Sequence, residues 1–196
     1  NKENIKANLR QWGHRDPESI HHPRITPPND PYLTSHSFGG VKVAKRLGLL
    51  SMDHLEVLSE DDECSLGPDG PIAVGLPLCS LYLGIPYAPL GRMLQRGQRI
   101  ALGSDLNPGS APSGNPWLSW GLASLNCGLD PRTALASMTI MAAAAMGMQD
   151  SAGSLYPGSR AAFMTMPHGF QPATAVAGMG LNLATKVYAG NLLPQS

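Results

Sequence analysis

The chain has 196 residues, a length that suits one domain with a hydrophobic core. Lys plus Arg equals Asp plus Glu at 14 each, so the formal net charge is zero and predicts no general attraction to nucleic acid or to an acidic membrane. Only 14% of residues are charged, against about 25% in typical soluble domains. No stretch is long and apolar enough for a membrane span, and we expect none.

Residues 1–38 are rich in proline, which excludes a long helix or a central strand there. We predict an extended segment that becomes ordered only when it lies on another surface. Its histidines are compatible with metal binding, but in a proline-rich coil we interpret them as surface side chains. They are His14, His21, His22 and His36.

From Gly39 onward, short helical patterns alternate with short apolar strands. Asp130 and Pro131 are typical of an N-cap and a first helical position. The predicted elements, in chain order, are a helix at 41–47 that ends at Gly48, a strand at 49–52, a strand at 71–78 with its proline at the exit, a helix at 88–98, a strand at 99–104, helices at 115–129 and 130–148, and short strands around a Pro-Gly turn at 152–166.

Strands that alternate with helices predict parallel βαβ units with right-handed crossovers. In such folds the chemistry gathers where the strands end. His54 and Asp105 each follow a predicted strand, so both are candidate site residues. Two simpler interpretations stay open, because an acid before Asn-Pro-Gly can merely start a turn and a histidine at a strand end can merely be hydrogen-bonded there.

The three cysteines, Cys64, Cys79 and Cys127, are odd in number and widely spaced, and none lies in a Cys-x-x-Cys motif. This pattern is typical of free thiols in a reducing, intracellular compartment, and it argues against a disulfide framework or a structural zinc site. The first residue is Asn1 rather than Met, so a processed N-terminus and an organellar (mitochondrial) location stay open beside the cytoplasm.

Three stretches, "LGLLSMDHLEVLSED", "RIALGSDLNPGSAPS" and "LDPRTALASMTIMAAAAMGMQDSAGSLYPGSRAAFM", resemble the C-terminal part of the imidazolonepropionase family in order and spacing. That family belongs to the amidohydrolase superfamily and opens the imidazolone ring in histidine degradation. The resemblance covers residues 39–165 and continues more faintly to Leu193. It implies an α/β fold made of the last three or so βα units of a (β/α)8 TIM barrel, around a site that holds one zinc or iron.

The resemblance also implies residue roles. Asp105 matches the metal ligand after strand eight, and His54 matches the histidine that lies beside the metal-bound water after strand six. Asn107, Gly109 and Ser110 match the loop that holds the substrate. A metal lowers the pKa of its bound water towards neutrality, and a carboxylate beside that water can take its proton.

The chain departs from the family pattern at the other ligands. It contains no His-x-His pair, and the first four strands have no counterpart. Where the family has a His-x-x-Glu motif, Pro31 and Thr34 stand at the positions of the His and the Glu, and only a shorter loop would let His36 substitute. We therefore expect no cofactor in this chain alone, and zinc or iron only if other residues complete the site.

Three βα units leave two open sheet edges and an uncovered inner face, so we expect an obligate protein partner or a large assembly. The sequence divides into an extended segment at 1–38, a partial barrel at 39–150 and a short β-containing segment at 151–196. The first hypothesis is a degenerate amidohydrolase fragment that serves as a non-catalytic structural subunit. The alternative is the C-terminal piece of a split metal-dependent amidohydrolase that cleaves the imidazolone ring C–N bond. An unrelated α/β binding domain is a third possibility.

Overall fold

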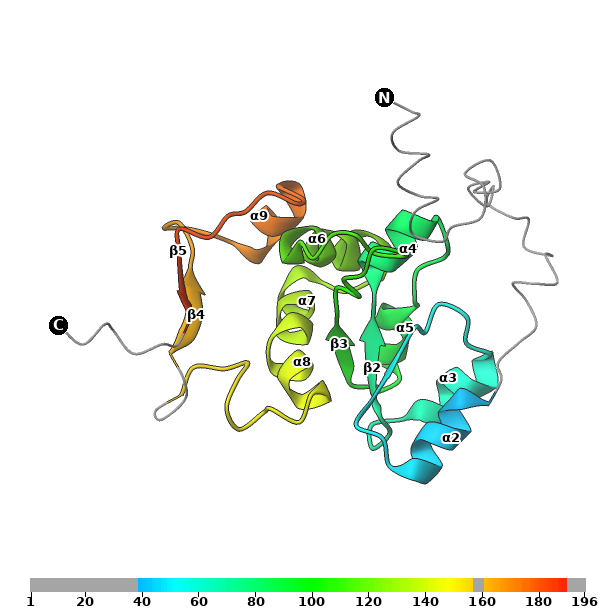
Figure 1. Ribbon diagram of the computed structural model, residues 1–196. Helices are drawn as coiled ribbons and strands as arrows, with labels where there is room; N and C mark the ends of the chain where they lie inside the picture. Colours follow the sequence, from blue (N-terminus) through cyan, green and yellow to red (C-terminus); the bar gives the residue numbers. More distant parts are fainter. Residues whose placement is uncertain (1–38, 157–160, 190–196) are drawn as a thin grey trace.

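A computed structural model describes residues 39–156 and 161–189. The predicted extended segment at 1–38 lies outside the described residues. Element labels follow Figure 1. In chain order the elements are α2 (Gly40–Leu47), β1 (Ser51–Asp53), α3 (Glu60–Leu66), β2 (Ile72–Gly75), α4 (Pro77–Leu83), α5 (Leu90–Gln95), β3 (Ile100–Leu102), α6 (Pro116–Asn126), α7 (Pro131–Met138), α8 (Ile140–Ala145), β4 (Ala162–Thr165), α9 (Pro172–Ala177) and β5 (Lys186–Ala189).

The centre of the fold is a three-stranded parallel sheet in the order β1-β2-β3. Ser51 pairs with Ile72 at the start of β1, and Ala73 pairs with Ile100 between β2 and β3. Each strand follows its predecessor across the sheet, with helices in the connections, as in a segment of a (β/α)8 barrel. This is the predicted partial barrel, and its parallel strands end at one common edge.

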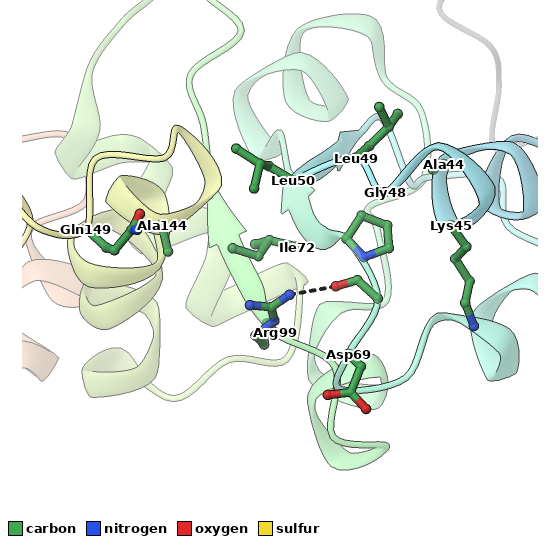
Figure 2. A pocket seen from close by; sticks show the side chains of 12 residues that line it. Ala44, Lys45, Gly48, Leu49, Leu50, Asp69, Ile72, Arg99, Ala144 and Gln149 are labelled. Carbon is green, nitrogen blue, oxygen red and sulfur yellow. Dashed lines mark hydrogen bonds between the residues drawn. The ribbon is translucent and has the colours of Figure 1, made fainter.

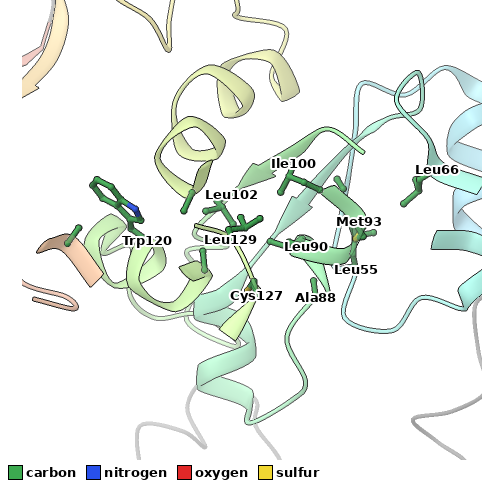
Figure 3. Close-up of a cluster of buried hydrophobic side chains, with 14 of the residues drawn as sticks. Leu55, Leu66, Ala88, Leu90, Met93, Ile100, Leu102, Trp120, Cys127 and Leu129 are labelled. Carbon is green, nitrogen blue, oxygen red and sulfur yellow. The ribbon is translucent and has the colours of Figure 1, made fainter. Parts of the chain in front are cut away.

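One face of the sheet carries the larger hydrophobic core, which Figure 3 shows in close-up. Ile100 and Leu102 of β3 point to this face and meet Leu90 and Met93 of α5, and all four are at least 94% buried. Gly91 lets α5 approach the chain after α6, since a Cβ there would lie 2.3 Å from the carbonyl oxygen of Gly128. Burying apolar area at about 25 cal/mol per Å² makes this layer the main source of stability.

The opposite face of the sheet, which faces inward in a closed barrel, is covered by the chain's own helix α8. Ile72, Val74 and Ala101 of this face are buried. Met141 and Ala144 of α8 pack against their cluster. In Figure 1, α7 and α8 lie on one side of β2 and β3, and α2, α3 and α5 lie on the other. The expectation of an uncovered inner face is therefore wrong, and it gives no support to an obligate partner, which stays a prediction.

Three further element predictions are corrected. The strand at 71–78 ends at Gly75, because Pro77 has no N–H for the ladder and instead begins α4. The helix at 130–148 is interrupted at Thr139, whose backbone (φ −118°, ψ −87°) separates α7 from α8. Helix α3 was not predicted, although Ser59 caps it by accepting a hydrogen bond from the backbone N–H of Asp62 at 3.1 Å.

The predicted strands around the Pro-Gly turn form differently. No strand lies at 151–156, and β4 pairs antiparallel with the distant β5, where Phe163 stacks on Tyr188 with ring centroids 4.5 Å apart. Between these strands, α9 packs on α6 and α7 through the buried Ala175. The sequence predicted strands at 152–166, which include β4, but pairing with a strand about 24 positions further along the chain depends on tertiary contacts that local turn chemistry does not show.

Candidate metal and catalytic site

The candidate site lies at the edge where β1, β2 and β3 end. His54 directly follows β1, and Asp105 lies three positions beyond the end of β3. Among the described residues, these two are the non-glycine residues with positive φ, at 57° and 50°. The left-handed region is unfavourable for L-residues but tolerated by His and Asp, and such conformations cluster at functional sites. The backbone therefore bends sharply at both residues that the sequence selected.

Three potential ligand atoms converge at this edge, one each from His54, Cys79 and Asp105, and all lie within 4.8 Å of one another. Cys79 comes from the first turn of α4, immediately after β2, and is buried. His54 is exposed, and Asp105 is partly buried. Since β2 lies between β1 and β3, the chain that leaves β2 brings the thiol to the same edge as the imidazole and the carboxylate.

The loop after Asp105 is held by its own side chains. The Asn107 Oδ1 accepts hydrogen bonds from the backbone N–H groups of Gly109 and Ser110, both at 2.8 Å. The Asn107 Nδ2 donates to the Asp105 carbonyl at 2.6 Å and to the Ser110 Oγ at 2.8 Å. The Ser110 hydroxyl in turn donates to the Asp105 Oδ2 at 3.0 Å. The residues predicted to contact substrate therefore also fix the orientation of the Asp105 carboxylate.

The side chain of Glu56 lies close to that of His54. Its side chain is 6% exposed, and its Oε2 lies 3.8 Å from the His54 Nδ1, which is longer than a hydrogen bond. Among the described residues its buried Oε1 has no hydrogen-bond partner. A buried carboxylate oxygen without a partner is unfavourable and rare in folded proteins. Glu56 thus places a carboxylate oxygen without a hydrogen-bond partner among the described residues beside the imidazole, where a nearby cation would satisfy it.

The thiols of the two buried cysteines are held protonated. Burial raises the pKa of Cys79; a hydrogen bond from Ser110 opposes this effect, and the negative charges of Asp105 and Glu56 add to it. Burial also raises the pKa of Cys127 to about 12, again with a contribution from Glu56. Both are free thiols, as predicted. Neither is a thiolate at neutral pH unless a cation or a proton acceptor arrives.

A pocket of about 520 Å³ lies at the opposite, amino end of the strands (Figure 2). Ile72 and Arg99 line it, and the Arg99 Nη2 donates to the carbonyl oxygen of Gly70 at 2.7 Å. Lys45 and Asp69 are the other charged residues of its lining. In barrel folds this end maintains stability and the carboxyl end performs chemistry, so we place no catalytic site here.

A family model described as "Amidohydrolase family" matches residues 12–191 of the chain. The chain belongs to the amidohydrolase family. The match extends across the predicted boundaries after residues 38 and 150, and the division into three parts stays a prediction. Among the described residues, no helix is long and apolar enough to cross a membrane.

Curated relatives of this amidohydrolase are imidazolonepropionases. The protein from Deinococcus deserti is 42% identical over 130 residues, which cover 66% of this chain and 32% of that protein. The protein from Deinococcus radiodurans is 37% identical over 153 residues, which cover 78% of this chain and 38% of that protein. The resemblance found in the sequence is thereby confirmed, and the chain spans about a third of the length of these relatives.

Solved structures confirm the fold class. A Xanthomonas campestris adenosine deaminase with bound zinc matches with a TM-score of 0.64 at 19% identity, over 96% of this chain and 47% of that one. Guanine deaminase from E. coli matches with a TM-score of 0.59 at 20% identity, over 74% of this chain and 39% of that one. At these identities the likeness concerns the fold, which is that of a partial amidohydrolase barrel.

The residues of the described edge fit a zinc-class metal, because imidazole nitrogen, thiolate sulfur and carboxylate oxygen are all zinc ligands. The sequence patterns predict His54 and Asp105 as site residues but not Cys79 or Glu56. Metal-binding cysteines often lie close together in a sequence, whereas here single residues come together from the ends of successive strands. The available signal was position, since Cys79 follows a strand as His54 and Asp105 do. The stretch that bears Pro31, Thr34 and His36 lies outside the described residues.

Proposed function

We propose that this amidohydrolase is the C-terminal part of a metal-dependent enzyme that opens an imidazolone ring by hydrolysing a C–N bond. The remaining metal ligands, a His-x-His pair and a further histidine, would come from the rest of the barrel, on the same or a separate polypeptide. The observation that carries the proposal is the convergence of His54 and Asp105, both in left-handed backbone conformation, at the carboxyl edge of the sheet. The similarity to imidazolonepropionases supports this substrate class.

The residues of the candidate site have different roles in the proposed reaction. Asp105 holds the metal, zinc or iron, and the Ser110 hydroxyl fixes the rotation of its carboxylate. When bound, the metal supplies Lewis acidity and lowers the pKa of water. His54 is exposed and can carry a proton between solvent and the ring nitrogen that leaves, because an imidazole both accepts and donates protons. Asn107 and Gly109 shape the loop that the substrate would contact.

The other hypothesis, a non-catalytic structural subunit, depends on the absent His-x-His pair and on Pro31 and Thr34. Those positions lie outside the described residues, and nothing in the described residues favours that hypothesis. The same applies to an obligate partner, to the absence of nucleic-acid binding and to the cellular compartment, which all stay predictions.

The test is complementation. The chain is co-expressed with the part of the Deinococcus deserti imidazolonepropionase that precedes its aligned C-terminal third, and loss of imidazolonepropionate is followed spectroscopically. We expect ring opening only when both pieces are present. Asp105→Asn in this chain should abolish the activity, and the exposed control Asp69→Asn, at the amino end of the strands, should retain it. A purified complex of both pieces that leaves the ring intact would refute the proposal.

A further inference from the structure

The ligand set assigned by the family resemblance includes Asp105 alone from this chain, yet the structure brings two more ligand types to the same point. We propose that the chain by itself binds a divalent metal of the zinc class through the Cys79 thiolate, the Asp105 carboxylate and the His54 imidazole. The inference concerns metal binding by this chain and does not depend on ring hydrolysis.

The distances suit one shared ion. With zinc–sulfur bonds of about 2.3 Å and zinc–nitrogen or zinc–oxygen bonds of about 2.0–2.2 Å, tetrahedral ligand atoms lie about 3.3–3.7 Å apart. The three ligand atoms lie within 4.8 Å of one another. Side-chain rotations that move each atom by about 1 Å would bring all three to bonding distance of one metal ion. Three protein ligands with a fourth position open is the pattern of zinc sites that also bind water or substrate.

The donor types decide which metal. A thiolate is a soft ligand that favours zinc and cobalt, whereas magnesium and calcium require sets of oxygen ligands. Cys79 is buried, so the sulfur side of the site is shielded from water, and the exposed imidazole of His54 leaves an approach from solvent. A metal site needs such an entry path as well as its ligands.

Glu56 is the independent observation that points to a cation. Its side chain is 94% buried, one carboxylate oxygen has no hydrogen-bond partner in the part of the chain that the structure describes, and the other lies 3.8 Å from the His54 Nδ1. Metal-bound histidines commonly donate their second ring N–H to a carboxylate, which sets the ring orientation. A small rotation of His54 towards the ion would leave its Nε2 for the metal and its Nδ1–H for Glu56.

His54 has different roles in the two proposals. It is a direct ligand in this chain alone, and it carries protons when a complete barrel supplies the other ligands. The two can be tested separately, because metal binding is measured on this chain without any partner and ring opening is measured only on the reconstituted pair. A chain that binds metal through Cys79 but gives no activity on complementation would refute the proposed function and leave the present inference intact.

The experiment is a cobalt(II) titration of the full chain, followed by absorption. We expect one cobalt per chain and the near-ultraviolet charge-transfer band that a thiolate ligand produces. Cys79→Ser should lose this band and bind zinc at least about 10-fold more weakly in a competition assay with a chromogenic chelator. The matched control Cys64→Ser, which changes an exposed thiol, should retain both the band and the affinity.

A second measurement guards against misfolding of the variant. X-ray absorption at the zinc edge of the unmutated chain, loaded with one zinc, should show a sulfur ligand at about 2.3 Å. Cobalt binding without a thiolate band would assign the metal elsewhere, for example to the histidines of residues 1–38, and would overturn the inference. Retention of the band in Cys79→Ser, or a zinc-edge spectrum without a sulfur ligand, would also overturn it.

Discussion

Two glutamates occupy equally buried positions in different regions of this molecule. Glu63 lies in the helical layer between α3 and α5, with a side chain 2% exposed, and Glu56 lies at the carboxyl edge of the sheet, with a side chain 6% exposed. Glu63 accepts hydrogen bonds from Arg92, with 2.7 Å from Nη2 to Oε2, and its Oε1 lies 2.9 Å from Arg96. Within residues 39–156 and 161–189, Glu56 has no hydrogen-bonded basic partner, and its Oε1 has no hydrogen-bond partner at all.

The difference is between a carboxylate that is paired within the fold and one that the proposed metal site would pair. Arg92 holds the pKa of Glu63 below its ordinary value through a hydrogen bond, against the opposing effect of burial and with help from the charges of Arg92 and Arg96. Removing one partner of a buried, paired carboxylate is strongly destabilising, because the other group is left buried without its partner. A buried carboxylate that is left unpaired opposes folding, and proteins retain such groups mainly where function requires them.

The largest expected effect concerns the carboxyl edge itself. Asp105→Asn should weaken zinc binding by at least about 100-fold, because it removes a charged ligand rather than an outer hydrogen bond. Asp69→Asn makes the same chemical change at the amino end of the strands, where no cluster of ligands gathers among the described residues, and should leave zinc affinity within about twofold. Competition with a chromogenic chelator measures both variants. An equal loss of zinc affinity in the two variants would show that the carboxyl and amino ends of the strands do not differ in metal binding.

The next effect concerns the helical layer. Glu63→Gln should lower the free energy of unfolding by about 2 kcal/mol at pH 7, because it removes hydrogen bonds made to a charged group. Glu60→Gln, which alters an 85% exposed side chain 3.8 Å from Arg96, should change it by less than about 0.5 kcal/mol. Urea unfolding followed by circular dichroism measures both variants. Zinc affinity should be the same in both, since neither residue lies at the site.

The effect of Glu63 should depend on pH with a defined sign. Its pKa in the folded chain is lowered from the ordinary value of 4.5, so its contribution is fully present above that value and is lost as pH falls through the lower, folded value. The stability difference between the unmutated chain and Glu63→Gln should therefore shrink below pH 4.5. A difference that grows on acidification would show that the carboxylate of Glu63 is not the stabilising form.

The smallest expected effect distinguishes Glu56 from Glu63 directly. Glu56→Gln should leave the stability unchanged or raise it by up to about 1 kcal/mol, because a neutral amide is less costly to bury than an unpaired charge. The same variant should weaken zinc binding by about 10-fold, through lost orientation of His54. Urea unfolding and chelator competition on one preparation give both numbers. A loss of stability as large as that of Glu63→Gln would contradict the comparison.

Sequence reasoning reached much of the fold because the local signals were strong. Asp130 caps α7 by accepting from the backbone N–H of Arg132 at 3.0 Å, as the Asp-Pro pair predicted. The apolar run before Asp105 forms β3, and all of its residues are buried. The elements that were misjudged were decided by other parts of the chain, since β4 pairs with β5 and α8 settles on the inner face of the sheet.

By itself the sequence determined the family and the alternation of strands and helices, and it predicted two residues of the candidate site, because strand-end position and the family motif are both local properties. Only the tertiary structure decided that Cys79 joins His54 and Asp105 and that Glu56 stays unpaired. The reason is geometric: parallel strands end at one edge, so residues 25 and 26 positions apart in the chain become neighbours, and spacing in the sequence carries no record of that convergence.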